Sequence, residues 1–242
     1  MRREFVRQAP SFAASGSFFG NESIASWIGD ALTLEASDRV LDVCGGAGHL
    51  SRALADQARE FTVLDLTREL LDAGQQVAPQ NVRFVEADAA AMPFADDEFD
   101  VVVSRFAFHH LPDQRAVLRE MARVARPGGL VAVIDMANGG GRHDELEILR
   151  DPSHTHAFTD AEASSMMTGL GEGRLTVDVR RQAMAVEAWL TQAAPPPAAR
   201  DAVLGALTAE AAGGDATGLH AHRDADGILQ LAQRWLLLLW RS

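Results

Sequence analysis

Glycines and a carboxylate follow two successive hydrophobic runs near the start of the chain. Gly45, Gly46 and Gly48 come directly after residues 39–43, and Asp65 ends the next run. Glycines at the end of a strand remove Cβ atoms, so a ligand can lie against the backbone at the start of the next helix, where free N–H groups favour a carboxylate or a phosphate. Such a loop alone is weak evidence, because a tight turn in any doubly wound domain has the same composition.

Asp65 and Asp88 strengthen the prediction of a ligand site, because each stands where a hydrophobic run ends. Ligands of open α/β sheets bind across the carboxyl ends of the strands, where an acid at position 65 can accept both ribose hydroxyls of a nucleotide cofactor. Capping of the helix from Thr67 onward is the alternative role for Asp65. A dinucleotide cofactor is disfavoured, because Ser51 stands where its fingerprint requires a small glycine or alanine.

Short β-branched runs alternate with helical stretches between residues 39 and 136, as in βαβ units. The expected strands are 39–43, 61–65, 82–86, 100–104 and 130–136, with two late strands at 175–179 and 235–240. The expected helices are 50–59, 68–77, 113–125 and 184–192. The pattern predicts an α/β fold with a doubly wound, seven-stranded, mostly parallel sheet.

The chain of 242 residues is long enough for one such domain and a cap. Residues 1–37 carry aromatic and aliphatic side chains at partly helical spacing and are expected to form an N-terminal helical lid over the mouth of the sheet. Residues 38–242 form the main domain, with a cap inserted at about 138–170 and late antiparallel strands to the C-terminus. The stretch 209–218 is expected to be a loop or a frayed helix end.

The composition and the net charge limit the classes of molecule that this protein is expected to bind. The net charge is −12 and no basic run could follow a phosphate backbone, so we expect a small-molecule substrate and no nucleic acid. No apolar run approaches the ~20 residues that a membrane span needs, and no signal-peptide stretch is present, so we expect a cytoplasmic protein without a membrane partner. The single cysteine, Cys44, cannot form an internal disulfide or a cysteine-based zinc site. The sequence leaves a homodimer open.

Taken together, the motifs resemble those of class I S-adenosylmethionine (SAM) dependent methyltransferases. The series 40–50, Val-Leu-Asp-Val-Cys-Gly-Gly-Ala-Gly-His-Leu, resembles the first motif of this family, and the ubiquinone-biosynthesis-like subgroup (methyltransferase type 11) is the most similar. Also similar are 65–67, 86–94, 99–105 running to 109–110, and 126–129. The resemblance covers roughly residues 5–137, implies a Rossmann-like methyltransferase fold, and extends to the last third only through its two late strands.

The resemblance implies SAM as the cofactor and assigns its ligands. Asp65 would bind the ribose hydroxyls, Asp88 the adenine amino group, and the Ala89 N–H the adenine ring. The full set of implied cofactor-binding residues is Asp42, Cys44, Gly45, Gly46, Gly48, Asp65, Leu66, Asp88, Ala89, Ser104 and Arg105.

At the methionine end, the resemblance implies that Gly46 and Gly48 bracket the ligand, that Asp42 supports the loop, and that the backbone around residues 104–105 accepts the ammonium. Two positions depart from the family pattern. Cys44 stands where glycine or alanine is common, and Phe12 stands where a tyrosine hydroxyl often lies near the cofactor carboxylate.

Methyl transfer from a sulfonium needs the nucleophile, carbon and sulfur in line, so most of the catalysis can come from orientation. A base is needed only for a hydroxyl or a carbon acid. The candidates are His109 and His110, after the fourth strand, and His154, with Asp151 or Arg150 to orient it. The alternatives are structural: histidines that shape a loop, which we favour for the 109–110 pair, and a capped turn at 151–154.

The remaining histidines lack the spacing of metal ligands, so we expect no metal and solvated histidines at positions 143, 154 and 156. The sequence therefore predicts a SAM-dependent methyltransferase that acts on an O, N or C atom of a small molecule, with quinone-like compounds or natural products suggested by the resemblance. Two alternatives stay open: a methyltransferase-like cyclase or isomerase that keeps SAM, and a nonenzymatic SAM-binding protein.

Overall fold

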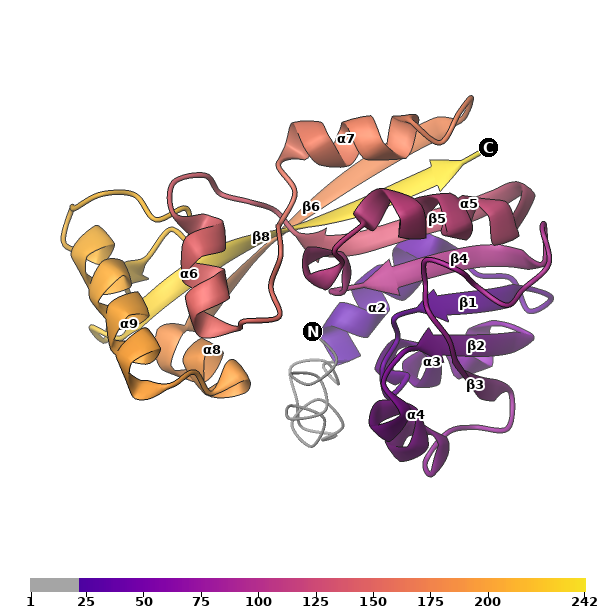
Figure 1. The fold of residues 1–242 in the computed structure, drawn as a ribbon, viewed down its shortest axis with the longest axis horizontal. Helices are drawn as coiled ribbons and strands as arrows, with labels where there is room; N and C mark the ends of the chain where they lie inside the picture. The colour runs from indigo at the N-terminus through magenta and orange to yellow at the C-terminus, as the bar shows by residue number, and fades with distance from the viewer. Residues whose placement is uncertain (1–21) are drawn as a thin grey trace.

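A computed structural model describes residues 22–242, which fold around one mixed sheet (Figure 1). The strand order is β3-β2-β1-β4-β5-β8-β6, and a short strand, β7, pairs with β8. The strands are β1 Arg39–Val43, β2 Glu60–Asp65, β3 Val82–Glu86, β4 Phe99–Arg105, β5 Ala125–Met136, β6 Arg174–Ala185, β7 His222–Arg223 and β8 Leu229–Arg241. The helices are α2 Glu22–Leu32, α3 His49–Ala53, α4 Arg68–Gln75, α5 Gln114–Val124, α6 His143–Arg150, α7 Asp160–Thr168, α8 Val186–Ala193 and α9 Pro197–Ala211.

The first five strands run parallel, so their carboxyl ends meet at one edge of the sheet. β8 is antiparallel to both of its neighbours, β5 and β6, and β6 therefore points the same way as the first five. The predicted α/β fold with a mostly parallel sheet is confirmed, but the sheet has eight strands, because the short β7 is added to the seven expected. Only one of the two late strands runs against the others.

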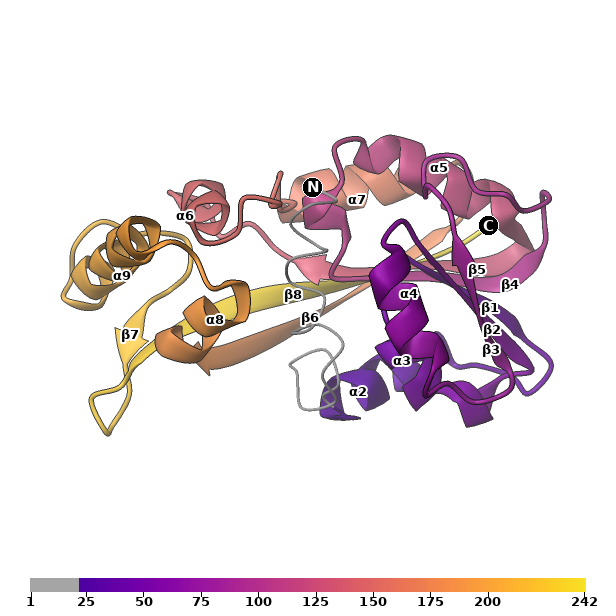
Figure 2. The same ribbon diagram turned by 60° about the horizontal axis from the view of Figure 1, so that its bottom comes forward.

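Helices cover both faces of the sheet, with α5 and α7 on one side and α2 and α3 on the other (Figure 2). Successive side chains of β1 point to opposite faces of the sheet, and both faces are apolar. Val40 packs in the core with α2 and α3, while Leu41 packs in the core with α5. Buried strands of this kind are apolar on both faces. The site residues are consequently confined to the strand ends.

The described part of the expected lid, α2, packs on a face of the sheet. Ile24, Ile28 and Leu32 are buried there against α3 and the strands, so this helix does not lie over the carboxyl edge. The rest of the expected lid, including Phe5 and Phe12, lies within residues 1–21, outside the described part of the chain.

Beyond the sheet, β6 and β8 continue as a two-stranded ribbon. Met136, the last residue of β5, pairs with Trp235, so residues 229–234 of β8 run past the carboxyl edge. Helices α6, α8 and α9 pack on this ribbon around Leu146, Trp189 and Leu207 and form a helical lobe (Figure 1). The segment expected as one cap is divided, because α6 joins this lobe while α7 packs on the sheet beside α5.

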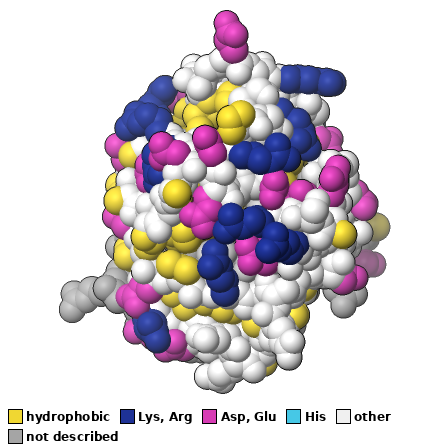
Figure 3. Space-filling view, turned by 90° about the vertical axis from the view of Figure 1, so that its right-hand side faces the viewer, with side chains coloured by type: hydrophobic (Ala, Val, Ile, Leu, Met, Phe, Trp, Pro, Cys, Tyr) yellow, Lys and Arg dark blue, Asp and Glu magenta, His cyan; other side chains and the backbone are white. Residues whose placement is uncertain are grey.

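The amino edge of the sheet carries charges of both signs. Arg39 pairs with Glu60 at 2.6 Å, and Arg126 pairs with Asp100 at 2.5 Å. Figure 3, which views this side, shows basic and acidic side chains interspersed. No helix of residues 22–242 combines the length and apolar character that a membrane crossing needs.

The helical lobe depends on its own small core, which leads to a stability prediction. Trp189 is 1% exposed, and Trp189→Ala is expected to lower the free energy of unfolding by about 3–5 kcal/mol, because its removal leaves a cavity. Urea denaturation followed by circular dichroism measures the change. Val177→Ala, at a side chain that is 44% exposed, is the control and should change it by less than ~0.5 kcal/mol. Equal effects of the two substitutions would contradict the existence of a lobe core.

Candidate functional site

A cavity of about 260 Å³ opens at the carboxyl edge of the sheet. Much of its lining comes from the carboxyl ends of four adjacent strands: 44–47 after β1, 66–67 after β2, 87–90 after β3, and Arg105 at the end of β4 with 106–107 after it. Asp42, Cys44, Gly45, Gly46, Leu66, Asp88, Ala89 and Arg105 are the predicted residues that line it. The fold thus brings together residues that lie far apart in the sequence.

A buried carboxylate lies beneath the glycine loop. Asp42 is 1% exposed, and its Oδ2 accepts a hydrogen bond from Ser51 Oγ at 2.7 Å. A Cβ on Gly45 would stand 2.7 to 2.9 Å from the carboxylate atoms of Asp42. Glycine is therefore required at position 45, because any side chain would collide with this carboxylate.

Burial raises the pKa of Asp42 to about 6, although the Ser51 hydroxyl and the charge of Arg105 act in the opposite direction. The cause is desolvation, which disfavours the charged form. A cation placed close to Asp42 would lower this cost. The cavity therefore suits a ligand that carries positive charge near the glycine loop.

Backbone strain also marks the loop. Cys44 has φ +56°, a left-handed conformation that is uncommon outside glycine, and Gly46 has the same φ. Burial raises the pKa of the Cys44 thiol well above its ordinary value, with nearby carboxylates adding to the shift. The thiol is therefore neutral at physiological pH, which argues against a nucleophilic role.

Asp65 lies just behind the cavity wall. Its Oδ2 accepts the Gly46 N–H at 2.9 Å and its Oδ1 accepts the Thr67 N–H at 2.8 Å. Burial raises the pKa of Asp65, although these two N–H groups pull it down. Asp65 thus fastens the glycine loop to the end of β2, while its neighbours Leu66 and Thr67 face the cavity.

Asp88 lines the cavity, and its Oδ1 accepts the Ala90 N–H at 2.8 Å. Two other predicted residues are not in the lining. Ser104 is fully buried, and Gly48 lies against the core, where a Cβ would meet Phe84 at 3.1 Å.

An apolar wall was missed by the sequence analysis. Phe106, Ala107, Leu111 and Pro112 supply this wall on the side of β4, and Phe106 has φ +52°. The position of residues 105–112 directly after a strand, at the carboxyl edge, is the signal that could have identified them.

A second, smaller cavity of about 60 Å³ adjoins the first. Phe106 and His110 line both cavities. The other walls come from the helical lobe and the ribbon, with Trp189 on α8, Trp235 on β8 and Glu147 on α6 among them. This cavity therefore lies between the sheet and the helical lobe.

The histidine pair after β4 is buried. His109 lines only the second cavity, and its Nδ1 lies 2.5 Å from Asp135 Oδ1. Burial lowers the pKa of His109, but the Asp135 carboxylate outweighs it and the net shift is upward. His110 Nδ1 lies 3.0 Å from Ser153 Oγ, and burial together with His109 lowers the pKa of His110 well below its usual range.

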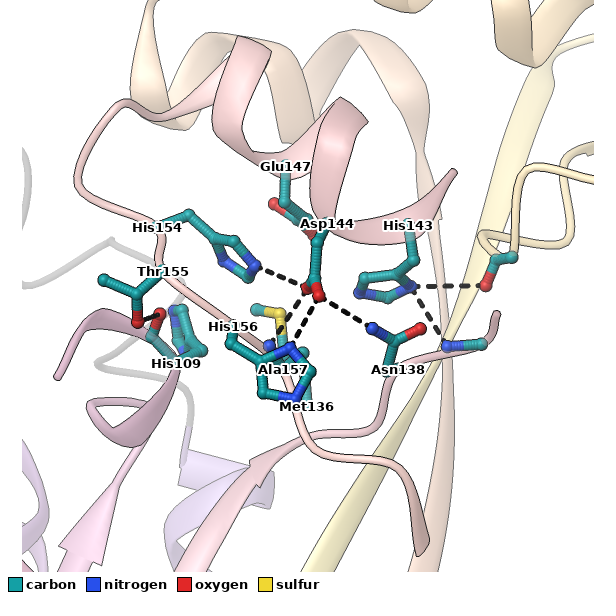
Figure 4. A network of polar contacts seen from close by, with 12 residues as sticks. His109, Met136, Asn138, His143, Asp144, Glu147, His154, Thr155, His156 and Ala157 are labelled. Carbon is teal, nitrogen blue, oxygen red and sulfur yellow. Dashed lines mark hydrogen bonds and ion pairs between the residues drawn. The ribbon is translucent and has the colours of Figure 1, made fainter. Parts of the chain in front are cut away.

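Asp144 organises the third candidate histidine (Figure 4). Its carboxylate lies 2.8 Å from His154 Nε2 and 2.7 Å from His156 Nδ1. His154 is therefore oriented by Asp144, and not by Asp151 or Arg150 as expected. Asp151 accepts the Ser153 N–H at 2.9 Å, as in a capped turn.

The expectation of solvated histidines is wrong for two of the three. His143 is 2% exposed, with its Nδ1 next to Gly139 and Gly218, and His154 is 5% exposed against Asp144; of the three, His156 alone is substantially exposed. Residues 22–242 contain no group of three or more potential ligand side chains that could hold a metal ion.

Comparison with known proteins identifies similarity to methyltransferases. Residues 41–133 match the family described as "Methyltransferase domain". The uncharacterized methyltransferase YcgJ of Bacillus subtilis is 36% identical over 142 residues, which are 55% of this chain and 56% of YcgJ. The uncharacterized protein YafE of Escherichia coli is 32% identical over 161 residues, which are 62% of this chain and 76% of YafE. The sequence match to YcgJ thus spans little more than half of its length.

Solved structures extend the similarity. The crystal structure of YcgJ has a TM-score of 0.82 at 23% identity and covers 92% of this chain and 99% of that one. Phosphoethanolamine N-methyltransferase 2 of Haemonchus contortus, in complex with SAM, has a TM-score of 0.67 at 16% identity and covers 100% of this chain and 59% of that one. At these sequence identities, the structural similarity shows that the chain shares the fold of these proteins.

The raised pKa of Asp42 leads to a pH prediction. The native state holds this proton up to about pH 6, whereas the unfolded chain loses it near ~3.9. Stability from the protonated form is therefore present at low pH and is lost as the pH rises through 6. Asp42→Asn, which cannot ionise, should raise the free energy of unfolding by about 1–3 kcal/mol at pH 8 and change it little at pH 4. Urea denaturation at the two pH values measures this difference, and an equal effect at both would contradict it.

Proposed function

The chain belongs to the class I SAM-dependent methyltransferases, and we propose on this basis that it transfers the sulfonium methyl group of SAM to an O, N or C atom of a small molecule. The observation that carries the proposal is the cavity at the carboxyl edge, where the glycine loop after β1 and the carboxylates of Asp42 and Asp88 line one space. SAM is the cofactor in this proposal.

The strand order supports one direction for the cofactor. From β3 to β4 the sheet runs β3-β2-β1-β4, so the lining of the cavity changes in that order along the edge. The adenine lies at Asp88, and the ribose lies at Asp65 at the carboxyl end of β2. The methionine part then lies at the glycine loop and the end of β4.

The acceptor binds in the second cavity in this proposal. This cavity begins where the first one ends, at Phe106 and His110, and it is lined by Trp189 and Trp235. At about 60 Å³ it is smaller than the ~150 Å³ that holds benzene, so it receives the reacting end of the acceptor. The aromatic side chains of this lining suit a step in which the sulfonium charge disappears, and polar side chains such as Glu147 and Gln233 complete the lining.

Among the three candidate bases, His110 is the one that lines both cavities. Ser153 Oγ donates to Asp151 Oδ1 at 2.6 Å, so it accepts from His110 Nδ1 and leaves the imidazole lone pair on Nε2. We assign to His110 the role of the base for a hydroxyl acceptor. His109 and His154, held by Asp135 and Asp144, support the site in this proposal.

Asp65 gives the first test. Asp65→Ala is expected to weaken SAM binding by roughly 1.5–3 kcal/mol, about 10- to 150-fold in Kd, because hydrogen bonds to a charged group are lost. Isothermal titration calorimetry measures the Kd. Asp72→Ala, at an exposed carboxylate on α4, is the matched control and should leave the Kd unchanged. An unchanged Kd for Asp65→Ala would count heavily against the proposed site.

Transfer itself is tested with SAM labelled on its methyl group and a small-molecule extract as the source of acceptors. Label is expected to appear in a small-molecule product, with one S-adenosylhomocysteine formed per product. Turnover of a substrate without formation of S-adenosylhomocysteine would overturn the proposal in favour of a SAM-dependent cyclase or isomerase.

A further inference from the structure

The N–H groups of the three loop glycines, where an anion was expected to bind, are already engaged within the protein. The Gly45 N–H donates to Leu64 O at 3.2 Å, the Gly46 N–H to Asp65, and the Gly48 N–H to Gly45 O at 2.9 Å. The helix that follows, α3, has only five residues, so its dipole is small. These three amides are therefore not available to the carboxylate of the proposed cofactor, and a cationic side chain is the stronger partner for it.

A cation stands at the same end of the cavity. Arg105 is the last residue of β4 and lines the cavity, and no other arginine among residues 22–242 does so. The sequence contains no lysine. Burial lowers the pKa of Arg105 to about 10, against the attraction of Asp42, and the side chain remains cationic at neutral pH.

The charges of Arg105 and Asp42 match those of an α-amino acid. Asp42 lies beneath the loop after β1, and Arg105 ends β4, which pairs with β1 directly. An ammonium near Asp42 and a carboxylate near Arg105 would each meet the opposite charge. The guanidinium offers five N–H donors in a planar fork, so it can bind a carboxylate through two hydrogen bonds while it also serves other partners.

We propose, building on the proposed function, that Arg105 binds the α-carboxylate of the methionine part of SAM and so makes this carboxylate a requirement for tight binding. Arg105 is then a binding residue for the cofactor and acts through its side chain. A purely structural role, in which Arg105 only balances the charge of Asp42, would affect every cofactor analogue alike.

The experiment compares SAM with decarboxylated SAM, which keeps the adenosine, the sulfonium and the amine but lacks the carboxylate. Calorimetric Kd values are measured for the wild type, Arg105→Gln, Arg105→Lys and the control Arg115→Gln, an exposed arginine on α5. Arg105→Gln should weaken SAM binding about 10- to 150-fold and change binding of decarboxylated SAM less than about threefold. Arg105→Lys should retain part of the discrimination, and the control should retain all of it.

Three results would overturn the inference: equal loss for both ligands, no loss for SAM, or wild-type protein that binds the two ligands equally well. The last comparison needs no variant, so it decides the question even if Arg105→Gln fails to fold. If the wild-type protein bound neither ligand, this result would instead contradict the proposed function, on which the inference rests. The two failures are therefore distinguishable.

Discussion

The site depends on one buried carboxylate and on the glycine that lies against it. Asp42 has little exposure to water, and Gly45 approaches its carboxylate so closely that no Cβ fits between them. Because burial makes the charged form of Asp42 unfavourable, a cationic group placed beside this carboxylate would stabilise it. Asp65 adds a second constraint by holding the Gly46 N–H, which fixes the loop relative to the end of β2.

Much of the parallel core was predictable, because its strands are short, apolar and bounded by turns. The expected strands 39–43 and 82–86 coincide with β1 and β3. The late strands proved much longer than expected, because the outer halves of β6 and β8 are rich in arginine and glutamine and are only partly buried. Helix α9 was missed because its alanine-rich sequence carries little amphipathic pattern, and its stability comes from packing in the helical lobe.

The gathering of most of the predicted residues around one cavity was also predictable, because parallel topology forces the ends of β1 to β4 together. What the sequence could not supply were pairings between distant side chains. His154 is oriented by Asp144 on α6, and His109 by Asp135 on β5, and neither pairing follows from spacing along the chain. The apolar wall at Phe106 could have been expected from its position after β4, but the left-handed backbone of Phe106 is unusual for a bulky residue and could not.

A crystal structure of the protein with S-adenosylhomocysteine tests the central claim most directly. The account predicts that the adenine lies beside Asp88, the ribose hydroxyls beside Asp65, and the amino acid end against Gly46, with the sulfur facing Phe106. Ligand bound elsewhere on the protein, or bound here with the nucleoside away from both carboxylates, would contradict it.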